Sequence, residues 1–144
     1  MDTKGIVMGT LVGGIVLYAT GYLIFDLAFG NFYPANVGSA TGVYRDTALM
    51  WADVLGCMSY AALITLGLGN RPDSSHIGAG AKIGAIVGFL LWFTVDFISY
   101  GNRNVWNLTL TVVDPLLELI RGGVGGGVIA VVLGKALSSG GQQA

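Results

Sequence analysis

Charged residues are scarce in this chain of 144 residues, because Asp, Glu, Lys and Arg together make up only 10% of it. Soluble domains carry about 25% charged residues, and a chain this apolar would expose large hydrophobic patches to water. The low charge content therefore argues against a soluble globule. The formal net charge is −1, so no broad basic surface is expected, and we exclude nucleic acid as a partner.

Cysteine and histidine are nearly absent, since Cys57 and His76 are the only residues of their kinds. A single cysteine forms neither an internal disulfide nor a CxxC redox pair, and the two residues do not complete a zinc site. The glycine-rich run 122–127 is not a phosphate loop, because no strand precedes it and no Lys-Ser/Thr pair follows it. We therefore expect no cofactor, and the sequence leaves any metal unknown.

Long apolar runs are what the sequence has in abundance, with 53% hydrophobic residues and a mean hydropathy of +0.71. Four runs, at about 6–29, 47–68, 77–100 and 108–133, reach the ~20 residues with which a helix crosses a bilayer. The sequence predicts an all-α, integral membrane four-helix bundle that occupies 1–144 as a single transmembrane domain. The lipid bilayer is then its main partner.

The first apolar run is expected to remain part of the fold. It exceeds the ~7–15 apolar residues of a secretory signal, and no clear A-x-A cleavage site ends it. The basic residues near the span ends favour one side of the membrane, which places both termini in the cytoplasm. Those on the cytoplasmic side are Lys4, Arg71, Lys82 and Lys135, and those on the other side are Arg45 and Arg103.

The two halves of the chain show an internal similarity. Aligning Gly9 and Gly13 with Gly84 and Gly88 superposes the first and third runs, and aligning Asp53 with Asp114 superposes the second and fourth. This pattern is typical of two repeated helical hairpins, as in parallel repeats of transporters. The alternative is that glycine-rich apolar helices share spaced glycines only because small residues let helices pack closely.

Acidic residues within the apolar runs carry the strongest functional signal, because each costs roughly 2.5–3.5 kcal/mol at the centre of a span. Under this topology Asp26, Asp53, Asp96 and Asp114 share one half of the membrane. Glu118 and Arg121 follow Asp114 on one helix face at spacings that predict an ion pair. The candidate ion- or ligand-binding residues are Asp53, Asp96, Asp114, Glu118 and Arg121.

One arginine does not neutralise several buried carboxylates, and unpaired carboxylates in a low dielectric take up protons or bind a cation. Pro115 loosens the fourth helix beside Asp114. Tyr18, Tyr22 and Trp92 are the candidates for lining a cavity, although aromatic residues within spans also serve as core. Asp26 and Asp53 have a second interpretation as carboxylates that face outer headgroups, and the ion pair has one as a purely structural contact.

The third and fourth runs, with Gly84, Gly88, Asp96, Trp106 and Asp114, resemble the second half of a family of small uncharacterised four-helix bacterial membrane proteins, a domain of unknown function. The resemblance covers about half of the chain. It implies a bacterial inner membrane and no established activity.

Three functional hypotheses follow, of which the first is a proton- or cation-linked transporter or small-ligand-binding bundle, expected as a homo-oligomer. The second is a non-catalytic accessory subunit of a larger membrane complex, which docks through its glycine faces and the outer segment 31–39. A membrane enzyme is least favoured, because no nucleophile with a positioned base is apparent beside the carboxylates.

Overall fold

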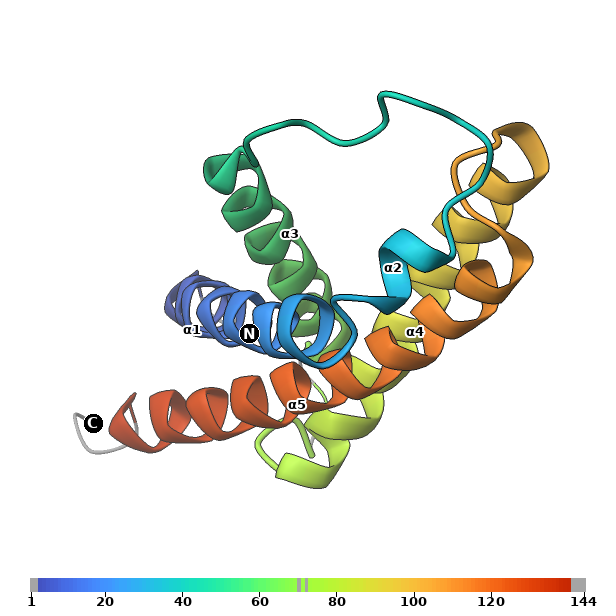
Figure 1. The fold of residues 1–144 in the computed structure, drawn as a ribbon. Helices are drawn as coiled ribbons and strands as arrows, with labels where there is room; N and C mark the ends of the chain where they lie inside the picture. Colours follow the sequence, from blue (N-terminus) through green and yellow to red (C-terminus); the bar gives the residue numbers. More distant parts are fainter. Residues whose placement is uncertain (1–2, 70, 72, 141–144) are drawn as a thin grey trace.

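The apolar runs form helices in the computed structural model, which describes residues 3–69, 71 and 73–140 (Figure 1). Their order is α1 (Thr3–Gly21), η1 (Tyr22–Ala28), α2 (Phe32–Ala35), α3 (Met50–Leu68), α4 (Ile77–Asn102) and α5 (Leu108–Gly140). Among the described residues, four helices are long and apolar enough to cross a membrane: α1 with its continuation η1, α3, α4 and α5. The predicted all-α fold with four long apolar helices is confirmed to that extent.

The helix ends differ from the predicted spans of 6–29, 47–68, 77–100 and 108–133, and α5 continues to Gly140. Two differences concern residues near the candidate site. The last seven residues of the first helix form the π-helix η1, whose wider turns are closed by a hydrogen bond from the Phe29 amide to the Ile24 carbonyl at 2.8 Å. Helix α3, which corresponds to the predicted span 47–68, begins at Met50. Leu49 leaves the helical conformation with a ψ of 82°, and no side chain caps the helix start. Both differences lie beside the site described below.

Helices α4 and α5 pack backbone against backbone through facing glycines. A Cβ atom added at Gly80 or Gly84 of α4 would meet the Gly126 or Gly122 backbone of α5, and one added at Gly122 or Gly126 would meet α4 in return. Small residues allow this close approach where apolar surroundings provide no hydrophobic drive. The glycine-rich run therefore lies within α5 and forms its packing face toward α4.

The apolar core lies beside these glycine contacts, where α1 packs on α3 and α5. Gly9 faces Thr65 of α3, and Gly13 faces Ala61 of α3 and Ile129 of α5. The three helices bring together a cluster of buried apolar side chains: Leu17, Cys57, Tyr60, Ala61, Ile64, Leu68, Ile129, Ala130 and Leu133.

The segment after η1 folds back over the start of α5. Val37 forms a β-bridge with Trp106, and the Gly38 amide donates to the Val105 carbonyl at 2.7 Å. The Asn107 side chain accepts a hydrogen bond from the Leu110 amide at 3.0 Å and donates to the Asn36 side chain at 3.1 Å. The amide oxygen of Asn107 therefore caps α5, and its amide nitrogen holds the segment after η1 in place.

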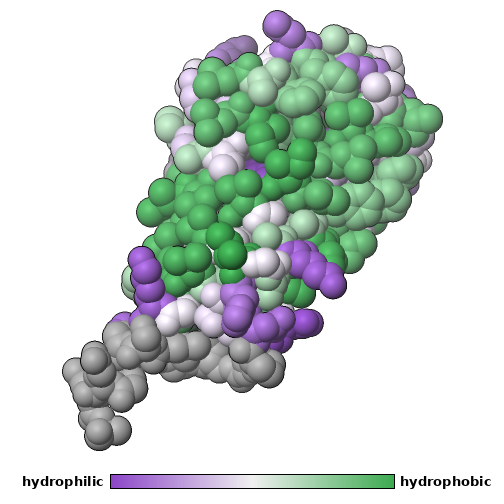
Figure 2. Space-filling view, turned by 90° about the horizontal axis from the view of Figure 1, so that it is seen from below, coloured by the Kyte–Doolittle hydropathy of each residue, from purple (hydrophilic) through white to green (hydrophobic). Residues whose placement is uncertain are grey.

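The outer surface of the helices is strongly apolar. Figure 2 shows a broad hydrophobic band across one face, with hydrophilic residues gathered toward its upper and lower edges. Large apolar side chains remain more than half exposed on every long helix, as on Ile15, Leu55, Ile98 and Ile120. The first residues of α3, 50–56, are all exposed, because this end of the helix leans away from its neighbours (Figure 1).

Candidate functional site

Helix α5 supplies three buried polar side chains along one face. Asp114, Glu118 and Arg121 are each at least nine-tenths buried, as expected for positions spaced by four and three residues that share a helix face. The Arg121 Nη1 atom lies 2.7 Å from the Glu118 Oε1 atom. The predicted ion pair between these residues is therefore present.

Arg121 also joins three helices. Its Nε donates to the Leu17 carbonyl of α1 at 2.9 Å, and its Nη2 donates to the Cys57 Sγ of α3 at 3.2 Å. The guanidinium lies over the Phe25 ring at 5.4 Å and over the Tyr60 ring at 5.8 Å from the centroids. These contacts hold the positive charge in place and surround it with apolar and aromatic groups.

Helix α4 brings a further carboxyl group against this face. Asp96 is 3% exposed, and its carboxyl group faces that of Asp114 within hydrogen-bonding reach. Among the described residues, the Asp96 Oδ2 and Glu118 Oε2 atoms are buried without a hydrogen-bond partner. Three carboxyl groups and one guanidinium thus gather in this region, and two of the carboxyl groups have an oxygen without a partner within the described part of the chain.

The short helix α2 packs against these carboxyl groups through Tyr33. The Tyr33 hydroxyl donates a hydrogen bond to the Asp114 Oδ1 atom, and the Tyr33 ring packs edge-on against Phe25 with centroids 5.4 Å apart. Burial, followed by the bond to Asp114 and the nearby carboxylates, raises the pKa of the Tyr33 hydroxyl far above its usual value. Tyr33 is therefore a neutral donor at physiological pH.

A cavity of about 210 Å³ lies among these groups, which we call the carboxylate cavity. The indole Nε1 atom of Trp92 is also buried without a hydrogen-bond partner within the described part of the chain. The walls of the carboxylate cavity combine acidic, aromatic and apolar side chains: Phe25, Tyr33, Trp92, Asp96, Trp106, Leu110, Asp114, Glu118 and Arg121.

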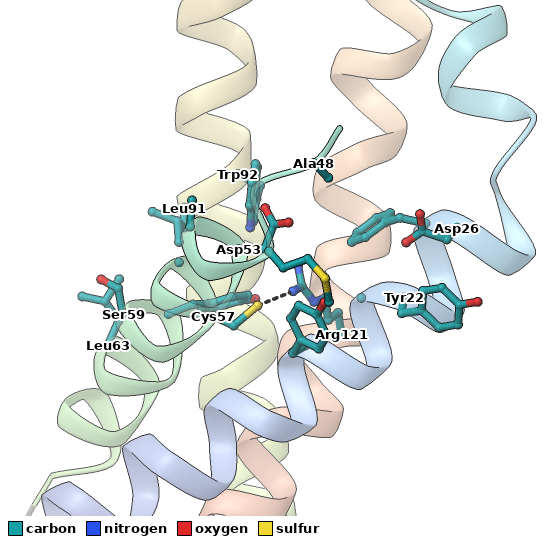
Figure 3. Close-up of a pocket in the computed structure, with 17 residues that line it drawn as sticks. Tyr22, Asp26, Ala48, Asp53, Cys57, Ser59, Leu63, Leu91, Trp92 and Arg121 are labelled. Carbon is teal, nitrogen blue, oxygen red and sulfur yellow. Dashed lines mark hydrogen bonds between the residues drawn. The ribbon is translucent and has the colours of Figure 1, made fainter. Parts of the chain in front are cut away.

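A second cavity of about 660 Å³, the wide cavity, opens between η1 and the exposed start of α3 (Figure 3). Phe25, Trp92 and Arg121 line both cavities and so form the wall between them. Figure 3 shows Arg121 in the lining of the wide cavity, with its hydrogen bond to Cys57. The two cavities therefore meet at one arginine and two aromatic rings.

The candidate residues from the sequence separate into two groups. Asp96, Asp114, Glu118 and Arg121 come together at the carboxylate cavity. Asp53 does not join them: it is exposed and lines the wide cavity, because the start of α3 leans outward. The three aromatic candidates all line the wide cavity, and Trp92 alone of them also reaches the carboxylate cavity: Tyr18, Tyr22 and Trp92. Their binding roles remain predictions.

Sequence reasoning did not identify Tyr33, Phe25 or Trp106 as part of the site. Tyr33 and Trp106 were expected in outer connections, and only the folding of 31–38 back onto α5 brings them to the carboxylates. Phe25 lies on η1, and no residue there signals a π-helix. Asp26, on the same turn, is exposed and lines the wide cavity. Its interpretation as a carboxylate that faces outer headgroups stays a prediction.

Comparison of the chain with protein-family models, with curated proteins and with solved structures found no match. The resemblance to a family of small bacterial membrane proteins therefore stays a prediction. Among the described residues, no three His, Cys, Asp or Glu side chains are grouped so that they could hold a metal ion.

Proposed function

We propose that the chain is an integral membrane protein of a bacterial inner membrane, with both termini in the cytoplasm. Four apolar helices of membrane-spanning length support insertion, and the exposed apolar side chains would then face lipid rather than water. The distribution of Lys and Arg near the helix ends supports the orientation. With this orientation the carboxylate cavity lies in the outer half of the bilayer.

We also propose the duplicated hairpin as the organising unit of the bundle. The alignment of Gly9 with Gly84 and of Asp53 with Asp114 makes Thr65 equivalent to Gly126. Gly9 faces Thr65 between α1 and α3, and Gly84 faces Gly126 between α4 and α5. Equivalent positions thus meet in both hairpins, which supports a common origin.

We infer that the protein is a proton- or cation-linked carrier that acts through the carboxylate cavity. The observation that supports this function is the excess of buried carboxyl groups over positive charge, with free oxygens on Asp96 and Glu118. Arg121 is already paired with Glu118, so it does not neutralise Asp96 and Asp114 as well. A proton or a cation that enters the carboxylate cavity removes this imbalance.

The charged and titratable groups around Asp96 and Asp114 come from three helices. From α5 the two aspartates face Glu118 and Arg121, and from α2 they face the neutral Tyr33 hydroxyl. Helix α3 contributes Tyr60 and Cys57 on the far side of Arg121. The wide cavity offers a route toward this group, because it reaches the same Trp92, Phe25 and Arg121 wall.

Proton flux in liposomes tests this function. Purified protein is reconstituted with an entrapped pH-sensitive dye, and the decay of an imposed pH gradient is followed with the membrane potential clamped. We expect flux above that of empty vesicles, and flux near the empty-vesicle level for Asp96→Asn and for Asp114→Asn. These changes keep the side-chain volume and remove the exchangeable proton.

The matched control is Asp73→Asn, which alters an exposed carboxylate in the connection before α4 and is expected to retain the flux. Size-exclusion profiles in detergent check that all variants fold. Wild-type flux no greater than that of empty vesicles, or unchanged flux in both cavity variants, would contradict the proposed function.

The alternative hypothesis, a non-catalytic accessory subunit, stays a proposal, although part of the surfaces through which it would dock is used within the chain. The glycines at 80, 84, 122 and 126 are occupied by contacts between α4 and α5, and Val37 and Gly38 of the outer segment bind the start of α5. A homo-oligomer or a larger membrane complex remains a proposal, for which the apolar outer face is the available surface.

A further inference from the structure

We propose that the carboxylate cavity binds a small organic ammonium ion that also carries a hydrogen-bond acceptor, such as an amino alcohol. This inference rests on the proposed carrier function and names its substrate class. It combines three features of the cavity walls: free carboxylate oxygens, aromatic faces and one unpaired donor.

The free carboxylate oxygens indicate the charge of the ligand. Asp96 and Glu118 are 3% and 1% exposed, and each has one oxygen without a partner among the described residues. Burying such an atom without a hydrogen bond or a counter-charge is costly. Both side chains line the carboxylate cavity, so a cation bound there would offset their charge, whereas an anion would add to the repulsion.

The aromatic walls distinguish an organic ammonium from a bare proton or an inorganic ion. Phe25, Tyr33, Trp92 and Trp106 all line the carboxylate cavity. Faces of tryptophan, tyrosine and phenylalanine attract substituted ammonium groups, and aromatic cages bind quaternary ammonium ligands in this way. Arg121 already lies over the Phe25 ring, so Trp92, Trp106 and Tyr33 are the rings available to a ligand.

The Trp92 Nε1 atom indicates the second part of the ligand. It is a buried donor without an acceptor in the described part of the chain, and an indole N–H only donates. A hydroxyl or carbonyl oxygen on the ligand would satisfy it while the ammonium group meets the carboxylates. The volume of about 210 Å³ is several times the ~30 Å³ share of one water, which suits a molecule of several non-hydrogen atoms.

Binding of choline, compared with its uncharged isostere 3,3-dimethyl-1-butanol, tests the inference. The two molecules have the same shape and hydroxyl group and differ in the positive charge. Titration of the purified protein in detergent, followed by calorimetry and by tryptophan fluorescence, is expected to show saturable binding of choline only. Trp92→Leu is expected to weaken choline binding by about 3- to 30-fold, and Asp96→Asn by at least about tenfold.

Two matched variants control for general effects on the fold. Trp51→Leu removes an exposed tryptophan on α3, and Asp73→Asn removes an exposed carboxylate; both are expected to leave choline affinity unchanged. Equal binding of choline and its isostere, no choline binding, or equal losses from Trp92→Leu and Trp51→Leu would overturn the inference.

The carrier function and the ammonium ligand can be rejected independently of each other. Proton flux that depends on Asp96, without choline binding, would retain the carrier and reject the ammonium class. Choline binding without proton flux would retain the ligand site and reject the carrier.

Discussion

Arg121 organises the site at the scale of single residues. It pairs with Glu118, donates to a backbone carbonyl of α1 and to the thiol of Cys57, and lies beside two aromatic rings. Buried pairs are weak contributors to stability as a whole, yet removing one partner costs about 3–5 kcal/mol. In the proposed carrier, Arg121 is therefore the fixed internal charge, and Asp96 and Asp114 are the exchangeable groups.

Tyr33→Phe is expected to change how stability depends on pH. Below about pH 10 the Tyr33 hydroxyl keeps its proton in the folded and the unfolded chain. Above it the unfolded chain releases the proton, whereas burial and Asp114 raise the pKa of the folded form. Stability therefore falls with rising pH through this range, by up to about 1.4 kcal/mol per pH unit for this group.

Thermal unfolding in detergent between about pH 9 and pH 11 measures this effect. The wild-type melting temperature should fall more steeply with pH than that of Tyr33→Phe, while Tyr100→Phe, which alters an exposed tyrosine, should follow the wild type. Equal slopes for Tyr33→Phe and wild type would show that Tyr33 is not buried against Asp114.

The sequence predicted part of this residue chemistry correctly. The ion pair between Glu118 and Arg121 follows from helix spacing alone, because three residues make nearly one turn. The position of Asp53 does not follow from spacing, since it depends on the tilt of α3. Tyr33 reaches Asp114 only through a bridge between two distant connections, and no local pattern encodes such a contact.

At the scale of helices, the glycine contacts between α4 and α5 determine how closely these two helices pack. Gly84→Ala places a Cβ atom against the Gly122 backbone, so the helices must separate. We expect a loss of about 1–3 kcal/mol. Gly78→Ala, on the same helix with open space around it, is the matched control and should stabilise the protein by up to about 1 kcal/mol. Melting temperatures in detergent compare the two.

A Gly84→Ala protein as stable as Gly78→Ala would contradict the close packing of α4 on α5. The glycine spacing predicted these packing faces, because small residues spaced by four are typical of close helix contacts. The π-helix η1 was not predictable, since its residues are as apolar as those of α1 and contain no proline.

At the scale of the whole molecule, an apolar core and a polar cavity adjoin at Arg121. The apolar core joins α1, α3 and α5, whereas the carboxylate cavity lies where α2, η1, α4 and α5 meet. Hydropathy predicted the four long helices. The topology predicted from the sequence placed the aspartates in one half of the membrane. The cavities depend on helix tilt and on the fold of the 31–38 segment, so they required the three-dimensional structure.

Infrared difference spectroscopy tests most directly the proposal that Asp96 and Asp114 exchange protons in the carboxylate cavity. Protein in lipid is titrated through the pH range in which carboxyl groups lose their protons, and the carbonyl stretch of protonated carboxyl groups is followed. We predict a band that disappears as pH rises, that is lost or shifted in Asp96→Asn and Asp114→Asn, and that persists in Asp73→Asn. A band unchanged by both cavity substitutions would contradict proton exchange at Asp96 and Asp114.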